Sequence, residues 1–154
     1  WPGYTSNQLT WDSLFLVCSP DLVGGDVSPE NPPTKPKQLS DHTLLHVMGY
    51  EEGWAFWLNQ FGYHNVDPSQ RIHFDSSITM MEMAALGHGI MLGRTCLVTN
   101  MLESGRLVAP FEESIASFEA FFLATPVNQY SHPDVEAFRY WLITQAEGET
   151  VLVE

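Results

Sequence analysis

Short, nearly continuous apolar runs alternate along the chain with stretches in which apolar residues have helical spacing. This pattern predicts β-strands alternating with α-helices. Short, nearly continuous apolar runs are typical of strands covered on both faces. Such runs lie at 14–18, 43–47, 71–75 and 89–93, and a more aromatic one lies at 118–125. Between them, apolar residues spaced as on one face of a helix predict helices at 51–61, 76–87 and 95–103, with a last helix after Ser131 and His132. This alternation indicates an α/β domain.

Two of the predicted helices carry wide apolar stripes, and we expect both stripes to be buried. The first consists of Trp54, Trp57, Leu58 and Phe61, and the last of Val135, Phe138, Trp141 and Leu142. The segment 21–37 is rich in Pro, Gly and Asp, which preclude regular structure through most of it, so we expect a surface connection there. The acidic end, 147–154, is expected to fray.

The composition indicates a globular and strongly acidic chain. Of its 154 residues, 44% are hydrophobic and 16% are charged, and the formal net charge is −13, from 6 Lys and Arg against 19 Asp and Glu. We do not expect this chain to bind nucleic acid by itself, because such affinity comes largely from neutralising phosphates. No apolar run is as long as a membrane-spanning helix, and the first residues lack the pattern of a signal peptide.

The two cysteines and the first residue give hints about context. Cys18 and Cys96 lie in apolar runs and are expected to be buried, reduced thiols of a cytosolic protein. The sequence begins at Trp1 without an initiator Met, so we expect that processing or truncation has removed a segment.

We find no motif typical of an enzyme or a metal site, and we expect no catalytic activity, no metal and no cofactor. His42 and His46 lie in a strand-like segment, where residues four apart are about 13 Å distant. The segment 75–77, DSS, lacks the flanking glycines of a nucleophile elbow. The segment 87–89, GHG, follows a predicted helix, whereas a dinucleotide-binding glycine loop follows a strand.

Binding of a small anion is the chemistry that the sequence favours. Ser76, Ser77 and Thr79 place hydroxyl groups and free backbone N–H groups at the predicted start of a helix, which suits a carboxylate. The alternative is that Asp75 or Ser76 only caps the helix. Arg94 follows a predicted strand, and its alternatives are a solvated loop charge or an ion pair with one of the many acids.

Six segments, in unbroken order over nearly the whole chain, carry a recognisable pattern. They are LFLVCSPDL, LSDHTLLHV, WAFWLNQFG, FDSSITMMEMAALGHGIMLGRTCLV, LESGRLVAPF and HPDVEAFRYWLITQA. Together they resemble the effector-binding domain of LysR-type transcriptional regulators, and most of all the glycine cleavage activator-like subgroup. No single segment is a catalytic signature.

The resemblance implies a fold like that of the type 2 periplasmic binding proteins, with two α/β lobes, crossing strands and a small-molecule cleft between the lobes. Residues 1–20 would form the end of lobe one and the first crossing strand. Residues 21–118 would form the effector-binding lobe two, and 119–154 the return crossing strand and the C-terminal helix of lobe one. The chain would then hold one complete lobe and the returning part of the other. The start of lobe one and the DNA-reading helix-turn-helix would lie outside this sequence.

By position, the resemblance implies an effector site made of residues at strand ends and helix starts. In α/β sheets these ends face the ligand crevice. The implied residues are Cys18, Ser19, His46, Ser76, Ser77, Gly93 and Arg94. The implied effector is an amino acid or another small carboxylate, and lobe one of such proteins supplies further contacts.

The resemblance also implies a cytoplasmic regulator that forms dimers or tetramers, contacts DNA only through its helix-turn-helix and has no membrane partner. Effector binding would change the angle between the lobes and so reposition the DNA-binding heads. A free-standing solute-binding protein that serves a transporter is the alternative, and an export signal would then precede Trp1. A third possibility is a fragment that folds only by self-association, through an apolar face left exposed.

Overall fold

The computed structural model describes residues 2–24, 39–50, 53–69, 71–127 and 132–149. These residues fall into two compact units. The larger unit is Ser13–Ser117, and the smaller unit combines Trp1–Asp12 with Phe118–Glu154. Both units combine strands and helices, which confirms the expected α/β class.

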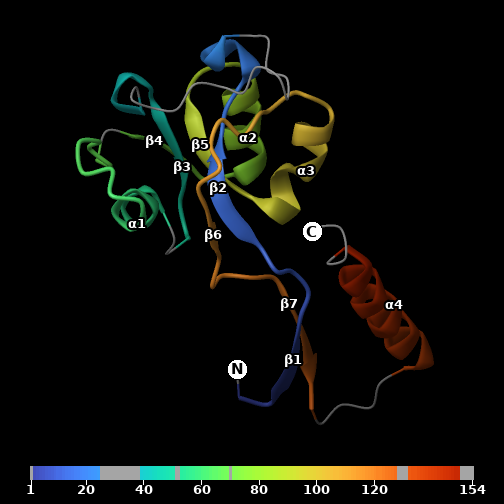
Figure 1. Cartoon of the computed structure of the whole chain (residues 1–154). Helices are drawn as coiled ribbons and strands as arrows, with labels where there is room; N and C mark the ends of the chain where they lie inside the picture. The colour runs from blue at the N-terminus through green and yellow to red at the C-terminus, as the bar shows by residue number, and fades with distance from the viewer. Residues whose placement is uncertain (1, 25–38, 51–52, 70, 128–131, 150–154) are drawn as a thin grey trace. The chain divides into compact units, whose positions relative to one another are not determined.

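The larger unit is built on a five-stranded mixed sheet in the order β4-β3-β5-β2-β6 (Figure 1). β3 runs parallel to β4 and β5, whereas β2 runs antiparallel to β5 and β6. Because they are parallel, β3, β4 and β5 end at the same edge of the sheet. The strands are β2 (Ser13–Val17), β3 (Leu44–Val47), β4 (Arg71–Phe74), β5 (Ile90–Arg94) and β6 (Ser114–Ala116).

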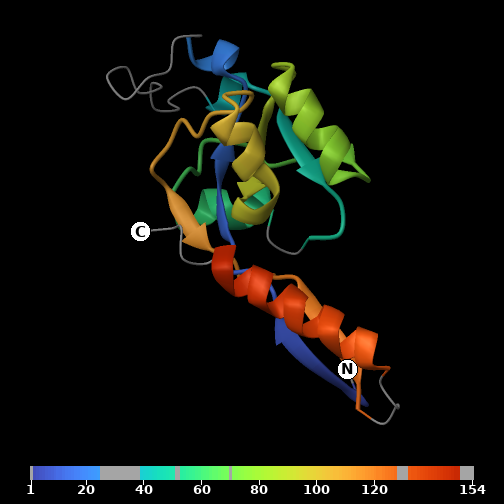
Figure 2. The same ribbon diagram turned by 90° about the vertical axis from the view of Figure 1, so that its right-hand side faces the viewer.

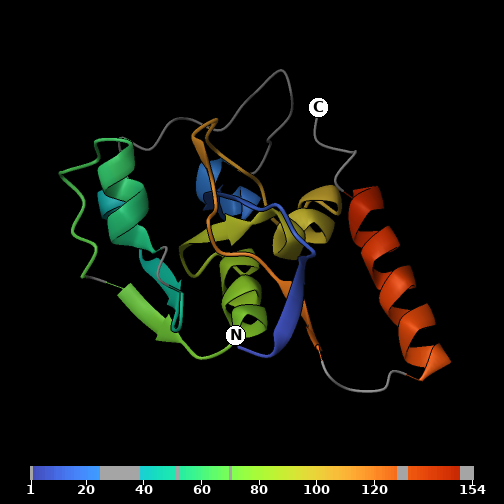
Figure 3. The same ribbon diagram turned by 90° about the horizontal axis from the view of Figure 1, so that it is seen from below.

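Helices cover both faces of this sheet, α1 on one face and α2 and α3 on the other (Figures 1 and 3). They are α1 (Trp54–Gln60), α2 (Ser77–Ala85) and α3 (Thr95–Glu103). Alternate strand residues point to opposite faces. Leu14 and Leu16 therefore join the core beneath α1, and Val17 joins the core beneath α2 and α3. This two-sided burial explains why the strands read as continuous apolar runs.

The smaller unit consists of two strands and one long helix. β1 (Tyr4–Gln8) pairs antiparallel with β7 (Phe122–Pro126), and α4 (Pro133–Glu149) follows. α4 lies beside the two strands (Figure 2), and Arg139 Nη2 donates a hydrogen bond to Asn7 Oδ1 at 3.4 Å. This unit therefore joins two parts of the chain that are far apart in sequence.

The expected burial of the apolar stripe on the last helix is wrong for this structure. The exposed fractions of Val135, Phe138 and Trp141 are 52%, 57% and 54%, and only Leu142 is half-buried. The physical reason is that periodicity predicts an apolar face but not what covers it. A unit of two strands and one helix does not supply enough surface to cover this face.

Several predicted boundaries also differ from the structure. The strand expected at 118–125 begins only at Phe122, and the strands β1 and β6 were not predicted. A short 3-10 helix, η1 (Pro20–Val23), includes the start of the surface connection expected at 21–37, and a second one, η2, spans Leu39–Asp41. Residues 25–37 of that connection, residues 51–52 of the first predicted helix, Ser131, and 150–154 of the acidic end lie outside the described residues.

Candidate functional site

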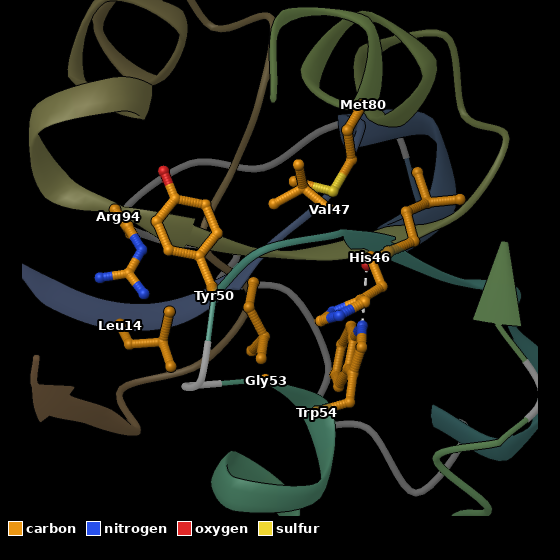
Figure 4. A pocket seen from close by; sticks show the side chains of 10 residues that line it. Leu14, His46, Val47, Tyr50, Gly53, Trp54, Met80 and Arg94 are labelled. Carbon is orange, nitrogen blue, oxygen red and sulfur yellow. Dashed lines mark hydrogen bonds between the residues drawn. The ribbon is translucent and has the colours of Figure 1, made fainter. Parts of the chain in front are cut away.

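A small pocket lies in the larger unit, at the edge of the sheet where the parallel strands end. Its wall includes His46 and Val47 from the end of β3 and Arg94 from the end of β5 (Figure 4). Parallel strands bring their carboxyl ends together, and ligands of α/β sheets bind at such edges. The remaining lining residues are Leu14, Leu45, Tyr50, Gly53, Trp54, Met80 and Leu92.

Arg94 is a buried cation on the wall of this pocket. Its exposed fraction is 5%, so it is not the solvated loop charge that the sequence left open as one alternative to binding. Its Nη1 donates a hydrogen bond to Ser117 Oγ at 2.6 Å, and its Cζ lies 4.2 Å from the centroid of the Tyr50 ring. Burial of a guanidinium is costly unless polar or aromatic partners compensate it. These contacts therefore hold the guanidinium in one orientation beside the pocket.

The backbone around Arg94 is fixed by the way β5 continues into α3. Arg94 is the last residue of β5 and also stands at the N-cap position of α3, so no loop separates the two elements. Thr95 Oγ1 accepts a hydrogen bond from Ser13 N at 3.1 Å and donates one to Ser13 O at 3.4 Å. A Cβ on the neighbouring Gly93 would lie 3.1 Å from Val17 and Val98. Gly93 thus allows close packing rather than lining the pocket.

His46 is a second nitrogen-containing ionisable side chain on the pocket wall, besides Arg94. Its ring is half-buried and meets the ring of His73 edge-on, with 5.4 Å between the ring centroids. Arg71 Nε in turn donates a hydrogen bond to His73 Nε2 at 3.3 Å. Burial lowers the pKa of His46 below its usual 6.5, and the charges of Arg71 and His73 lower it further. Gly53 leaves room for this ring, since a Cβ there would lie 3.0 Å from His46 Cε1.

The rest of the pocket wall is apolar and rigid. Trp54 is buried, and its Nε1 donates a hydrogen bond to Leu45 O at 2.8 Å, which fixes the indole at the start of α1. The enclosed space is about 30 Å³. That is room for one or two water molecules or a small group such as a carboxylate, and not for a whole amino acid. The arrangement can receive a small anionic group at Arg94 and His46.

The other residues expected at the site lie outside the pocket wall. Ser76 caps α2, and its Oγ accepts a hydrogen bond from Thr79 N at 3.5 Å; Ser77 is the first residue of that helix. Ser19 is buried, and its Oγ accepts a hydrogen bond from Asp21 N at 3.3 Å. Of α2, only Met80 lines the pocket. The structure thus brings His46 and Arg94 to one pocket but not the serines.

The two cysteines differ, contrary to the expectation that both are buried. Cys18 is fully buried in the core, and this burial raises the pKa of its thiol to about 12, so it stays protonated at neutral pH. Cys96, in the first turn of α3, is exposed. The apolar run around Cys96 belongs to a helix with only one buried face, and this explains the difference. Among the described residues, neither cysteine forms a disulfide.

Tyr50 and Trp54 are two of the pocket residues that the sequence did not predict. Trp54 was expected in the buried stripe of a helix, and no motif marked Tyr50. The available signal was position: Tyr50 follows the end of a predicted strand by three residues, where α/β proteins place ligand contacts. The cation–π contact with Arg94 pairs residues that are far apart in sequence, and it becomes visible only in the fold.

Two other kinds of site are absent from the residues that the structure describes. These residues include no group of three or more His, Cys, Asp or Glu side chains that could hold a metal ion. Within the same ranges, no helix combines the length and the apolar character needed to cross a membrane.

Comparisons with known proteins identify relatives over nearly the whole chain. The family model described as the LysR substrate binding domain matches residues 1–147. The chain is 32% identical over 149 residues to the glycine cleavage system transcriptional activator of Escherichia coli (strain K12), covering 97% of this chain and 47% of that protein. It therefore spans about half the length of the curated relatives it matches.

Solved structures give the same result. The effector domain of the transcriptional regulator AmpR of Pseudomonas aeruginosa matches with a TM-score of 0.74 and 26% identity, over 97% of this chain and 68% of that one. The AmpR effector binding domain from Citrobacter freundii matches with a TM-score of 0.75 and 25% identity, over 96% of this chain and 70% of that one. These matches confirm the expected fold, that of the periplasmic-binding-protein-like effector domains. The chain belongs to the family of LysR substrate binding domains, as the resemblance implied.

Proposed function

We propose that this chain is the effector-sensing part of a LysR-type transcriptional regulator and that its pocket receives the carboxylate group of the ligand, an amino acid or another small carboxylate. The observation that carries the proposal is the buried guanidinium of Arg94 on a pocket at the ends of β3 and β5. A buried cation beside an apolar wall favours an anionic group, because charge-assisted hydrogen bonds are strong where water is excluded. The family supports a regulatory role for this binding rather than catalysis.

The proposed mechanism is a shift between two arrangements of the complete regulator. A ligand moves such an equilibrium only if it binds the two arrangements with different affinity. We propose that ligand binding at this domain changes how a separate helix-turn-helix contacts DNA, in a bacterial cytoplasm. Residues 1–20 and 119–154 would belong to lobe one and 21–118 to lobe two. The alternative of a transporter-linked binding protein is disfavoured because the relatives named above are transcriptional regulators.

A ligand screen tests the proposal directly. The ¹⁵N-labelled chain is titrated with the common amino acids and with simple carboxylates, while amide and arginine side-chain resonances are followed by NMR. We expect some of these compounds to shift the resonances of Arg94 and of its pocket neighbours in a saturable manner. Ser77→Ala provides a further test of the helix-start residue that the sequence singled out. If every compound leaves the pocket resonances unchanged, the proposal of a carboxylate-binding sensor is wrong.

We also propose that the 154-residue chain self-associates through its smaller unit. Large apolar side chains are exposed there, and such exposed surface marks protein contacts. They include Phe118, Phe121, Phe122, Phe138 and Trp141, with exposed fractions between 49% and 63%. Because two molecules of charge −13 repel each other, we expect added salt to strengthen the association.

Sedimentation velocity measures this association. We expect a concentration-dependent increase in mass for the unaltered chain, and a shift toward monomer for Phe138→Asp and Trp141→Asp. Met48→Asp is the matched control, since Met48 is equally exposed but lies in the larger unit. A clean monomer at all concentrations would contradict the proposal.

A further inference from the structure

The imidazole of His46 lines the same pocket as the guanidinium of Arg94. It occupies the third position of β3, and Figure 4 shows its ring beside Gly53 and Trp54, with Arg94 and Tyr50 farther along the wall. Its ring contacts the edge of His73, its partner in the β3–β4 register. Among the described residues, the His46 ring has this aromatic contact and no hydrogen-bond partner. Within the described part of the chain, no hydrogen bond therefore competes with a bound group for the imidazole nitrogens.

Among the described residues, the charged and titratable groups beside His46 or on the same pocket wall are cationic or neutral. β4 contributes Arg71 and His73, β5 contributes Arg94, and the segment after β3 contributes Tyr50. α1 and α2 add only Trp54 and Met80 to the wall, neither of which is charged. No Asp or Glu is among the described residues that line the pocket, although the chain carries 19 acids against 6 Lys and Arg. Among the described residues, the pocket wall thus carries cationic side chains and no anionic ones.

In the absence of a bound anion, these surroundings disfavour protonation of His46. Burial lowers the pKa of His46, followed by the charges of Arg71 and His73. An anion beside the ring acts in the opposite direction, because an opposite charge nearby favours the protonated imidazole. Binding of an anion and binding of a proton at His46 therefore reinforce each other, as thermodynamic linkage requires.

We propose that the pocket takes up its carboxylate together with a proton, so that Arg94 and the His46 imidazolium form a two-cation site for an anionic group. The inference rests on the proposed function and extends it to the ligand's chemistry and to its control by pH. Affinity is highest below the pKa of His46 in the empty pocket. It falls as the pH rises toward the higher pKa of His46 in the complex, and above that value it is low and constant.

Sodium acetate is a suitable probe, because it is small and remains mostly ionised at the pH values compared. Its affinity for the full chain is measured by NMR titration at several pH values. We expect acetate to bind at least about threefold more tightly near pH 5.5 than near pH 8, since histidine changes charge between these values. Calorimetry in two buffers of different ionisation enthalpy gives the number of protons taken up, and needs no variant.

Two variants assign the proton to a residue. His46→Gln is expected to bind acetate with little pH dependence and without proton uptake. His88→Gln is the matched control, because His88 is exposed and lies outside the pocket wall, and it is expected to keep the wild-type pH dependence. Should His46→Gln fail to fold, the imidazole resonances of His46 in the unaltered chain, followed against pH with and without acetate, assign the proton instead.

The outcomes separate this inference from the proposed function. Acetate binding that depends on Arg94 but not on pH, without proton uptake, overturns the inference and leaves the proposed function intact. Proton uptake that persists in His46→Gln also overturns it, because another group then takes the proton. If neither acetate nor any compound of the screen binds, the proposed function fails and the inference fails with it.

Discussion

Arg94→Gln should weaken the binding of the best ligand from the carboxylate screen by at least about 30-fold. The substitution removes the positive charge but keeps an amide that can donate to Ser117. Loss of one partner of a buried, hydrogen-bonded charge pair costs about 2–5 kcal/mol, and 2 kcal/mol corresponds to about 30-fold in the dissociation constant. Isothermal titration calorimetry measures the change. The ligand affinity of Arg94→Lys should lie between those of the unaltered chain and Arg94→Gln, because lysine keeps the positive charge but lacks the planar guanidinium.

Arg106→Ala is the matched control for this prediction. Its guanidinium is half-exposed and pairs with Glu82 on the surface, away from the pocket wall. We expect its ligand affinity to stay within about twofold of the unaltered chain, because exposed ion pairs contribute little. A folded Arg94→Gln variant with unchanged affinity would show that the guanidinium does not contact the ligand, and the site assignment would then be wrong.

The second large effect concerns stability: Trp57→Ala should lower the free energy of unfolding by about 3–5 kcal/mol. Trp57 is fully buried, stacks on Tyr63 with 5.5 Å between ring centroids and also contacts Phe61 and Phe111. Its removal leaves a cavity between α1 and the sheet that the surrounding rings fill only in part. Urea denaturation followed by circular dichroism measures the loss.

A second Trp57 variant separates the effect of the indole N–H from that of the ring, and a variant at Trp11 serves as the control. Among the described residues, the Trp57 Nε1 has no hydrogen-bond partner although it is buried. Trp57→Phe removes this unpaired donor together with part of the ring, so we expect a much smaller loss than for Trp57→Ala. Trp11→Ala is the control, because its side chain is 55% exposed, and we expect a change within about 0.5 kcal/mol. Equal effects of Trp57→Ala and Trp11→Ala would contradict the packing argument.

Regular periodicity predicted most elements of the larger unit well. The helix expected at 95–103 has these bounds in the structure, and the strands of the parallel part differ from the prediction by one or two residues. These elements bury their apolar faces within the chain itself. Local sequence therefore contains the information that determines them.

The strands β1 and β6 could not be predicted because local sequence does not determine them. β1 reads YTSNQ and has no apolar alternation, and β6 is only three residues long. β1 is formed by pairing with β7, whose residues lie more than a hundred positions away. The exposed stripe of α4 has the same cause, since a helical pattern does not identify its partner.

The candidate site was predictable in position but not in composition. Strand ends at 46 and 94 follow from the alternation of elements, and the structure places both residues on one pocket. The cap at Ser76 was one of the two interpretations that the sequence left open, and its hydrogen bond to Thr79 N now accounts for that hydroxyl. Tyr50 and Ser117 reach Arg94 only through tertiary contacts, which no local pattern reveals.

The loop-free junction between β5 and α3 has a consequence for how ligand preference changes in evolution. With Arg94 at the end of a central strand and Thr95 bonded twice to Ser13, the ordering of this corner is complete before any ligand arrives. A preorganised group loses little entropy on binding. An insertion here would rotate the start of α3 and break the sheet, so we expect this side to stay constant. Ligand preference should instead change through pocket residues outside this junction, such as Met80 of α2.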